Sequence, residues 1–221
     1  MKSLDQTSIC PDARFWDRIA KRYSRKPVAD QQAYETKLAK TNSHLRATDR
    51  VLEIGCGTGT TAIHHAPRVA HVRATDISER MIEIARAKAQ AAEITNIDFE
   101  AISVDKLSAE SDSFDAILAH SILHLLPSVS RVLTQLNQML KPGGLLISST
   151  ACIRDFMPLF RYAAPIGRAL GVLPRVNVFG EAELERWLAE AGFVVEERWQ
   201  PKPKSGVYIV ARKPDESTPK S

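Results

Sequence analysis

From Arg50 onward, short apolar runs alternate with segments of helical periodicity. This alternation is typical of βαβ units, in which helices cover a mostly parallel sheet. Polar residues, glycine or proline bound each run, and we expect the runs to form five parallel strands: Val51–Ile54, His71–Thr75, Ile97–Val104, Phe114–Ala119 and Leu145–Ser149. The predicted fold class is therefore α/β with a doubly wound sheet.

Helices are expected between these strands, and a hairpin after them. Three segments have apolar residues at helical spacing together with an N-terminal capping residue or a terminating glycine. They predict helices at Ser78–Ala92, Ser128–Leu140 and Glu181–Ala191. Pro142-Gly143-Gly144 follows the second helix, and Gly192 ends the third. Strand candidates at Phe193–Trp199 and Val207–Arg212 flank a turn containing proline and glycine, which predicts a closing antiparallel hairpin.

The chain is predicted to divide into a cap, a main domain and a tail. Two helices broken at Pro27 are expected to form an N-terminal helical cap over residues 1–46. A Rossmann-like domain should cover 47–213, and its insertion at 151–178 is predicted to close over a substrate as a lid, with an extra packing helix as the alternative. We expect the polar tail, 214–221, to be disordered.

The composition is that of a folded globular protein, with 44% hydrophobic and 25% charged residues in 221. No apolar run approaches the roughly 20 residues that span a bilayer, and the first eleven residues lack a signal-peptide core, so we expect a cytoplasmic protein. The cysteines Cys10, Cys56 and Cys152 form no CxxC pair and have no histidine at metal-ligand spacing. Free thiols and no metal are expected.

The formal net charge of +4 raises the question of nucleic acid. Many of the cations lie in two terminal regions, Arg14–Lys26 and Lys202–Lys220. Only the stretch from Arg14 to Tyr23 interleaves cations with aromatic residues, as a nucleic-acid surface does. Nucleic acid is therefore not the expected partner, and nothing in the sequence indicates an oligomeric state.

A glycine-rich turn follows the first predicted strand and should open a helix near Thr58: Glu53-Ile54-Gly55-Cys56-Gly57-Thr58-Gly59-Thr60. In open α/β sheets, ligands bind at the carboxyl ends of the strands, and the first such turn is the usual cradle. Glycine permits close backbone approach, and N–H groups at a helix start favour anionic groups. A tight turn without a ligand also uses glycine, so the turn alone leaves both interpretations open.

Asp76 ends the second predicted strand, where an acidic side chain accepts both ribose hydroxyls of a bound nucleoside. A helix cap is the alternative role. The dinucleotide fingerprint GxGxxG requires a third glycine at position 60, which is Thr60 in this chain. The sequence therefore predicts a nucleoside ligand and argues against a nicotinamide coenzyme.

Four motifs in order carry a family resemblance: Val51-Leu-Glu-Ile-Gly-Cys-Gly-Thr-Gly59, Asp76, Asp105 after the third strand, and Leu140-Lys-Pro-Gly-Gly144 before the fifth. Over about residues 50 to 150, the chain resembles the class I S-adenosylmethionine-dependent methyltransferases. The resemblance implies a seven-stranded sheet of order 3-2-1-4-5-7-6 whose last strand is antiparallel. It also implies S-adenosylmethionine as the cofactor.

The resemblance also implies which residues contact each part of the cofactor. Those expected at the methionine portion are Glu53, His120 and the backbone of Gly55 and Gly57. Asp76 would take the ribose hydroxyls. The adenine would contact Ile77 and Met81 with its face, and its exocyclic amine would meet Asp105 with the backbone near Val104 and Lys106.

The stretch from Phe15 to Tyr23 resembles the N-terminal helix of small-molecule methyltransferases, including the quinone-biosynthesis type. In those enzymes a tyrosine often closes over the cofactor, which implies that role for Tyr23. An aromatic stripe at helical spacing also serves packing alone, so both interpretations stay open.

Methyl transfer from a sulfonium needs neither a metal nor a covalent intermediate, so positioning should supply most of the acceleration. A general base is required only if the acceptor must lose a proton. His124 is the first candidate and His120 the second, since both follow the fourth strand. A histidine among leucines is as often a satisfied core or rim residue.

The insertion at 151–178 suggests the acceptor. Its apolar residues and arginines would suit an apolar or aromatic molecule with an anionic group: Phe156, Met157, Leu159 and Phe160 with Arg154, Arg161 and Arg175. Contact of this apolar surface with a membrane is a lesser alternative. The sequence thus predicts in-line methylation of a small molecule; the alternatives are an RNA or protein methyltransferase and a non-catalytic nucleotide-binding protein.

Overall fold

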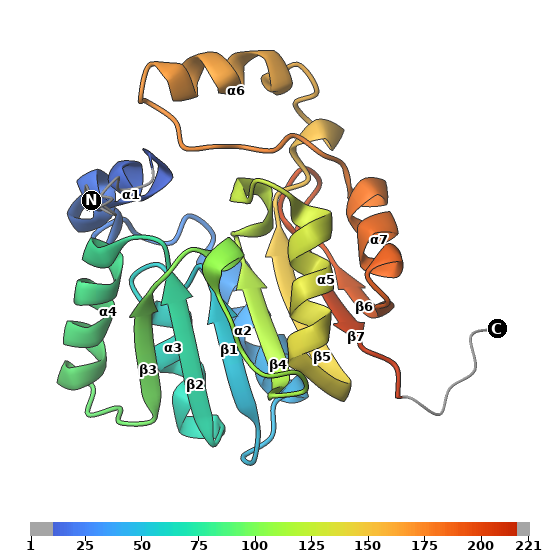
Figure 1. Cartoon of the computed structure of the whole chain (residues 1–221). Coiled ribbons are helices and arrows are strands. Elements are labelled where there is room, and N and C mark those ends of the chain that lie inside the picture. The colour runs from blue at the N-terminus through green and yellow to red at the C-terminus, as the bar shows by residue number, and fades with distance from the viewer. Residues whose placement is uncertain (1–10, 216–221) are drawn as a thin grey trace, which may run out of the picture.

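The computed structural model describes residues 11–215. Within that range, seven strands form one sheet of order β3-β2-β1-β4-β5-β7-β6 (Figure 1). Pairing is parallel from β3 to β5, and β7 runs antiparallel to both β5 and β6. The strands are β1 (Arg50–Ile54), β2 (His71–Asp76), β3 (Ile97–Ala101), β4 (Phe114–His120), β5 (Leu140–Thr150), β6 (Val194–Trp199) and β7 (Val207–Arg212). The predicted doubly wound sheet is confirmed.

Helices cover both faces of the sheet, because successive strand residues point to opposite sides. In β4, Ile117 belongs to an apolar cluster with residues of α5 and α7, whereas Leu118 belongs to one with residues of α3 and α4. The helices of the described range are α1 (Pro11–Tyr23), α2 (Gln31–His44), α3 (Thr60–His65), α4 (Glu79–Ala91), α5 (Val129–Met139), α6 (Phe160–Ala169) and α7 (Glu181–Glu190). None of these is long and apolar enough to cross a membrane.

Three predicted boundaries are wrong for local reasons. β3 ends at Ala101, and Val104–Lys106 forms a single 3-10 turn instead of continuing the strand. α3 begins at Thr60, because Gly59 has a φ of +74° that a right-handed helix cannot include. β5 begins at Leu140 and runs through the predicted Pro-Gly-Gly break, where its register against β4 shifts. A bulge of this kind accommodates residues that a regular strand excludes.

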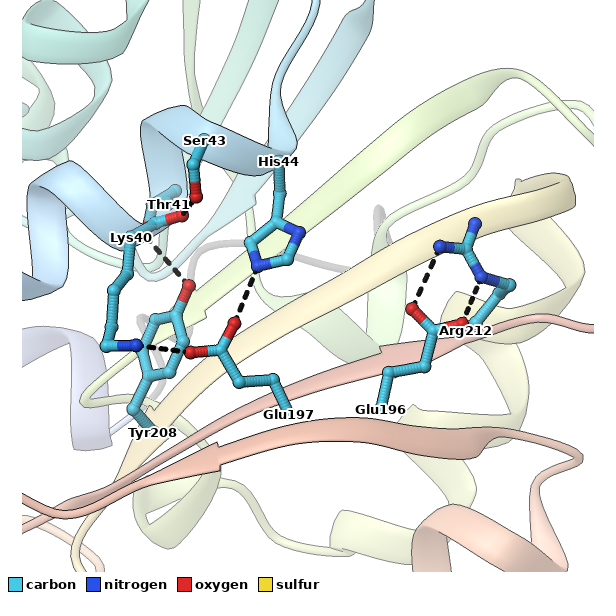
Figure 2. Close-up of polar contacts among 8 residues, drawn as sticks. All are labelled: Lys40, Thr41, Ser43, His44, Glu196, Glu197, Tyr208 and Arg212. Carbon is cyan, nitrogen blue, oxygen red and sulfur yellow. Dashed lines mark hydrogen bonds and ion pairs between the residues drawn. The ribbon is translucent and has the colours of Figure 1, made fainter.

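The cap and the tail lie partly outside the described residues, which exclude 1–10, with Cys10, and 216–221. Within the cap, α1 and α2 lie on either side of Pro27. Figure 2 shows how α2 is fixed to the sheet: Glu197 of β6 contacts both Lys40 and His44, and the buried Thr41 hydroxyl lies 3.5 Å from that of Tyr208. The cap is thereby fastened to the distant end of the chain.

Candidate active site

A cavity of about 390 Å³ opens where β1, β2, β3 and β4 end. Nine of the twelve predicted site residues line it: Tyr23, Gly55, Gly57, Asp76, Ile77, Met81, Val104, Asp105 and His120. Glu53, Lys106 and His124 are not part of its wall. The structure therefore brings together residues from four strand ends and the cap helix α1 around one space.

The glycine turn between β1 and α3 takes its shape from close packing. Gly55 has a φ of +65°, and a Cβ built there would lie 2.6 Å from the Ile122 side chain. A Cβ at Gly59 would lie 2.7 Å from Ala85 of α4. At Gly57 the space is open, and the nearest atom to such a Cβ is 3.9 Å away in Tyr23. The turn is therefore tight toward the protein and open toward the cavity.

Asp76 joins this turn to β2. Its carboxylate accepts bonds from the backbone N–H groups of Gly57 and Ser78, both at 2.9 Å. Burial raises the pKa of Asp76, and these two bonds oppose the rise. Both donors are neutral backbone groups, so neither bond neutralises the charge of the carboxylate. A ligand with hydroxyl donors can therefore complete its bonding, as the predicted ribose role requires.

The part of the cavity beyond Asp76 is mostly apolar, with Ile77, Met81, Ile102 and Val104 in its wall. Asp105 is exposed at the rim and accepts a hydrogen bond from Ser103. An apolar slot with a carboxylate at its edge fits a flat purine that has an exocyclic amine.

Two buried polar side chains, Glu53 and His120, come from strand ends and face the same side of the sheet. One Glu53 carboxyl oxygen and both His120 ring nitrogens have no hydrogen-bond partner among the described residues. Burial raises the pKa of Glu53 to about 8; the Lys37 ammonium opposes this rise and the Asp76 carboxylate adds to it. Burial, with Lys37 and His65, holds the pKa of His120 well below its ordinary value. These unpartnered groups fit a polar ligand portion, as the resemblance implies for methionine.

Tyr23 and Trp16 line the cavity from α1. Their rings meet edge to face with centroids 6.2 Å apart, and Tyr23 is half exposed. Burial and the nearby Asp76 raise the pKa of the Tyr23 hydroxyl. The predicted lid tyrosine therefore lies above the open side of the glycine turn.

His124 is placed beside the cavity wall instead of within it. Burial lowers its pKa to about 4, and its carbonyl accepts a 2.7 Å bond from the backbone of Asn177. The wall beside it is formed by residues that were not predicted to belong to the site: Ser121, Ile122, Leu125, Leu126, Arg131 and Gln135. Arg131 and Gln135 are one helical turn apart, beside the apolar stripe of α5. This spacing is the sequence signal from which their shared position on one helix face could have been predicted.

The insertion at 151–178 contributes no residue to the cavity wall, but it contacts its edge. Asp12, which lines the cavity, lies 3.3 Å from Arg168 and 3.5 Å from Arg175. Arg18 donates to the carbonyl of Gly171, and Asn177 donates to that of Leu126. The insertion is thus joined to both the cap and the cavity wall.

Comparisons with known proteins agree with this geometry. A methyltransferase-domain family matches residues 51–144. The chain is 31% identical over 181 residues to a ubiquinone biosynthesis O-methyltransferase of Chelativorans sp. (strain BNC1), covering 80% of this chain and 69% of that protein. It is also 31% identical over 176 residues to a malonyl-[acyl-carrier protein] O-methyltransferase of Paenibacillus sp. (strain JDR-2), covering 74% of this chain. It spans only 63% of the latter protein.

Among solved structures, an S-adenosylmethionine-dependent methyltransferase from Mesorhizobium loti has a TM-score of 0.68 and 24% identity, covering 83% of this chain and 99% of that one. At that identity the likeness shows the fold alone. The family assignment rests on the sequence matches, and the glycine turn that is open toward the cavity agrees with it. The chain belongs to the class I S-adenosylmethionine-dependent methyltransferases, and S-adenosylmethionine is its cofactor.

Proposed function

We propose that this enzyme methylates an oxygen atom of a small apolar or aromatic acceptor that carries an anionic group. One observation carries the proposal: Asp12 lines the cavity and is contacted by Arg168 and Arg175. Both contacts are long and partly exposed, so an anion on the acceptor can replace the Asp12 carboxylate. Trp16 and Leu125 supply apolar wall, and both similar relatives are named O-methyltransferases.

In this proposal, Asp76 accepts both ribose hydroxyls, Ile77 and Met81 contact the adenine face, and Asp105 with the Val104–Lys106 backbone meets its amine. Glu53, Gly55 and Gly57 hold the methionine portion. Bound S-adenosylmethionine supplies an electrophilic methyl group to an acceptor atom in line with the sulfur. The cap, with Tyr23, and the lid over 151–178 orient the acceptor and exclude water.

His120 is our candidate for the proton acceptor, in preference to His124. His120 lines the cavity, its lowered pKa keeps the imidazole neutral at physiological pH, and neither ring nitrogen has a hydrogen-bond partner among residues 11–215. A hydroxyl that loses its proton to this imidazole becomes the better nucleophile, and because the lowered pKa makes His120 a weak base, the contribution should be at the lower end of the usual range, about 10²-fold. His120→Ala should lower kcat by that factor, whereas His124→Ala should leave kcat within a few-fold of the parent.

The acceptor assignment is tested with labelled S-adenosylmethionine and paired acceptors, a hydroxybenzoate and the matching neutral phenol. We expect transfer to the carboxylate-bearing molecule, and Arg175→Ala should raise its KM about tenfold or more without changing that of the neutral phenol. Arg161→Ala is the matched control, since Arg161 stacks on Tyr162 and not on Asp12. Transfer to RNA or protein alone would reject the small-molecule assignment.

A further inference from the structure

Exposed apolar side chains gather on one short segment of the chain. Of the ten large hydrophobic residues that are exposed within residues 11–215, six lie between 157 and 172: Met157, Leu159, Tyr162, Ile166, Leu170 and Val172. Leu159 is 73% exposed and Leu170 is 72% exposed. A concentration of this kind on an otherwise ordinary surface marks an interaction site.

These side chains form a stripe along α6. Leu159, Tyr162, Ile166 and Leu170 are three or four residues apart, which places them on one helix face. The buried residues of α6 are Ala164 and Gly167, and Leu173 packs against Gly167 from the returning chain. Figure 1 shows α6 as the outermost element beyond the carboxyl ends of the strands. The apolar stripe therefore faces away from the rest of the protein.

Positive charge gathers beside the stripe. Residues 11–28 and 151–178 together contain ten lysines and arginines and three acids, a net charge of +7, although the whole chain carries only +4. In and just after α1, exposed cations form no ion pair with any described carboxylate: Arg14, Lys21, Arg22, Arg25 and Lys26. Contacts of Arg18 with Gly171 and of Asp12 with Arg168 hold α1 beside the α6 segment.

We propose that this face docks on an anionic membrane surface. The stripe of α6 lies in the interfacial plane with its aliphatic side chains among the acyl chains, and the cations of α1 contact the lipid headgroups. A protruding aliphatic ridge with cations beside it matches a bilayer better than an acidic protein, which would require a complementary groove. Membrane docking does not depend on the proposed acceptor, because lipid binding can be measured without methyl transfer.

Docking also orients the enzyme. Trp16 and Tyr23 of α1 line the cavity, and Tyr23 is half exposed, so the helix that carries the proposed lipid-contacting cations also forms part of the cavity wall. If the proposed function holds, an apolar acceptor can then enter the cavity from the lipid phase.

The test is co-sedimentation of the full chain with vesicles of phosphatidylcholine alone or mixed with phosphatidylglycerol. We expect binding to the mixed vesicles only, and loss of that binding at high salt. Ile166→Glu should weaken it about tenfold or more, and Arg22→Gln about fivefold. Val194→Glu is the matched control, because Val194 is an exposed apolar residue of β6 outside the stripe, and its binding should equal that of the parent.

Three outcomes would overturn the proposal: no sedimentation with either vesicle, equal sedimentation with both, or equal losses in Ile166→Glu and Val194→Glu. A further binding experiment uses an acidic acyl carrier protein in place of the vesicles. If it binds the chain in the absence of vesicles, and Ile166→Glu removes that binding while vesicles fail to bind, the face is a protein-docking surface instead.

Discussion

The floor and the roof of the active site are built differently. The floor consists of the glycine turn and Asp76, where backbone N–H groups bond a carboxylate at 2.9 Å and Gly59 leaves no room for a Cβ. The roof consists of α1 and the insertion at 151–178, which contacts the edge of the cavity; the two meet through partly exposed ion pairs of 3.3 to 3.5 Å that join Asp12 to Arg168 and Arg175. The difference indicates a closely packed floor beneath a roof that is held by weaker contacts.

The largest effect is expected in the floor, from Gly59→Ala. The new methyl group meets Ala85 at 2.7 Å in a left-handed backbone conformation, so the free energy of unfolding should fall by about 3 kcal/mol. Gly57→Ala is the control, since it has a similar φ and open space, and should lose about 1 kcal/mol. Urea unfolding measures both. Equal losses would show that packing does not fix the turn.

A smaller effect should appear in the pH dependence of stability. With a pKa of about 8, Glu53 keeps its proton in the folded state at pH values where the unfolded state, with an ordinary value of 4.5, has released it. Stability from this group therefore falls as pH rises, by about 1 kcal/mol between about pH 7 and 8.5. Glu53→Gln should remove this slope in urea unfolding at the two pH values. If the free energy of unfolding of Glu53→Gln still falls by the same amount over this pH range, another group is responsible for the pH dependence.

The attachment of α2 to β6 offers an intermediate case between floor and roof. Glu197 contacts both Lys40 and His44, and these bonds lower its pKa (Figure 2). Glu197→Gln should reduce the free energy of unfolding by about 0.5–1 kcal/mol at neutral pH. The loss should disappear in acid, as pH falls through the lowered pKa. A loss above about 2 kcal/mol would mean that this contact is as rigid as the floor.

The smallest effect is expected in the roof. Asp12→Asn weakens two long, partly exposed ion pairs, so global stability should change by less than about 0.5 kcal/mol. Amide hydrogen exchange in α6 should nevertheless become about twofold faster. A large global destabilisation would contradict the view that the roof is loosely held.

Sequence reasoning succeeded where a local pattern determines the structure. The strand alternation, the glycine turn and Asp76 are each encoded within a few residues, and the structure brings them together. It failed where distant segments meet: Arg168 reaches Asp12 from 156 positions away, and no local periodicity signals that contact. The turn at Val104–Lys106 does not follow from the sequence pattern, because Ile102 and Val104 extend the apolar run of β3.

A cycle of four calorimetric affinities tests whether Asp76 at the glycine turn holds the ribose. S-adenosylhomocysteine and its 2′-deoxy analogue are each titrated into the parent protein and into Asp76→Ala. We predict that losing the hydroxyl weakens binding to the parent by about 1.5 kcal/mol or more, and leaves the affinity of Asp76→Ala almost unchanged. Equal losses in both proteins would show that Asp76 does not bind this hydroxyl.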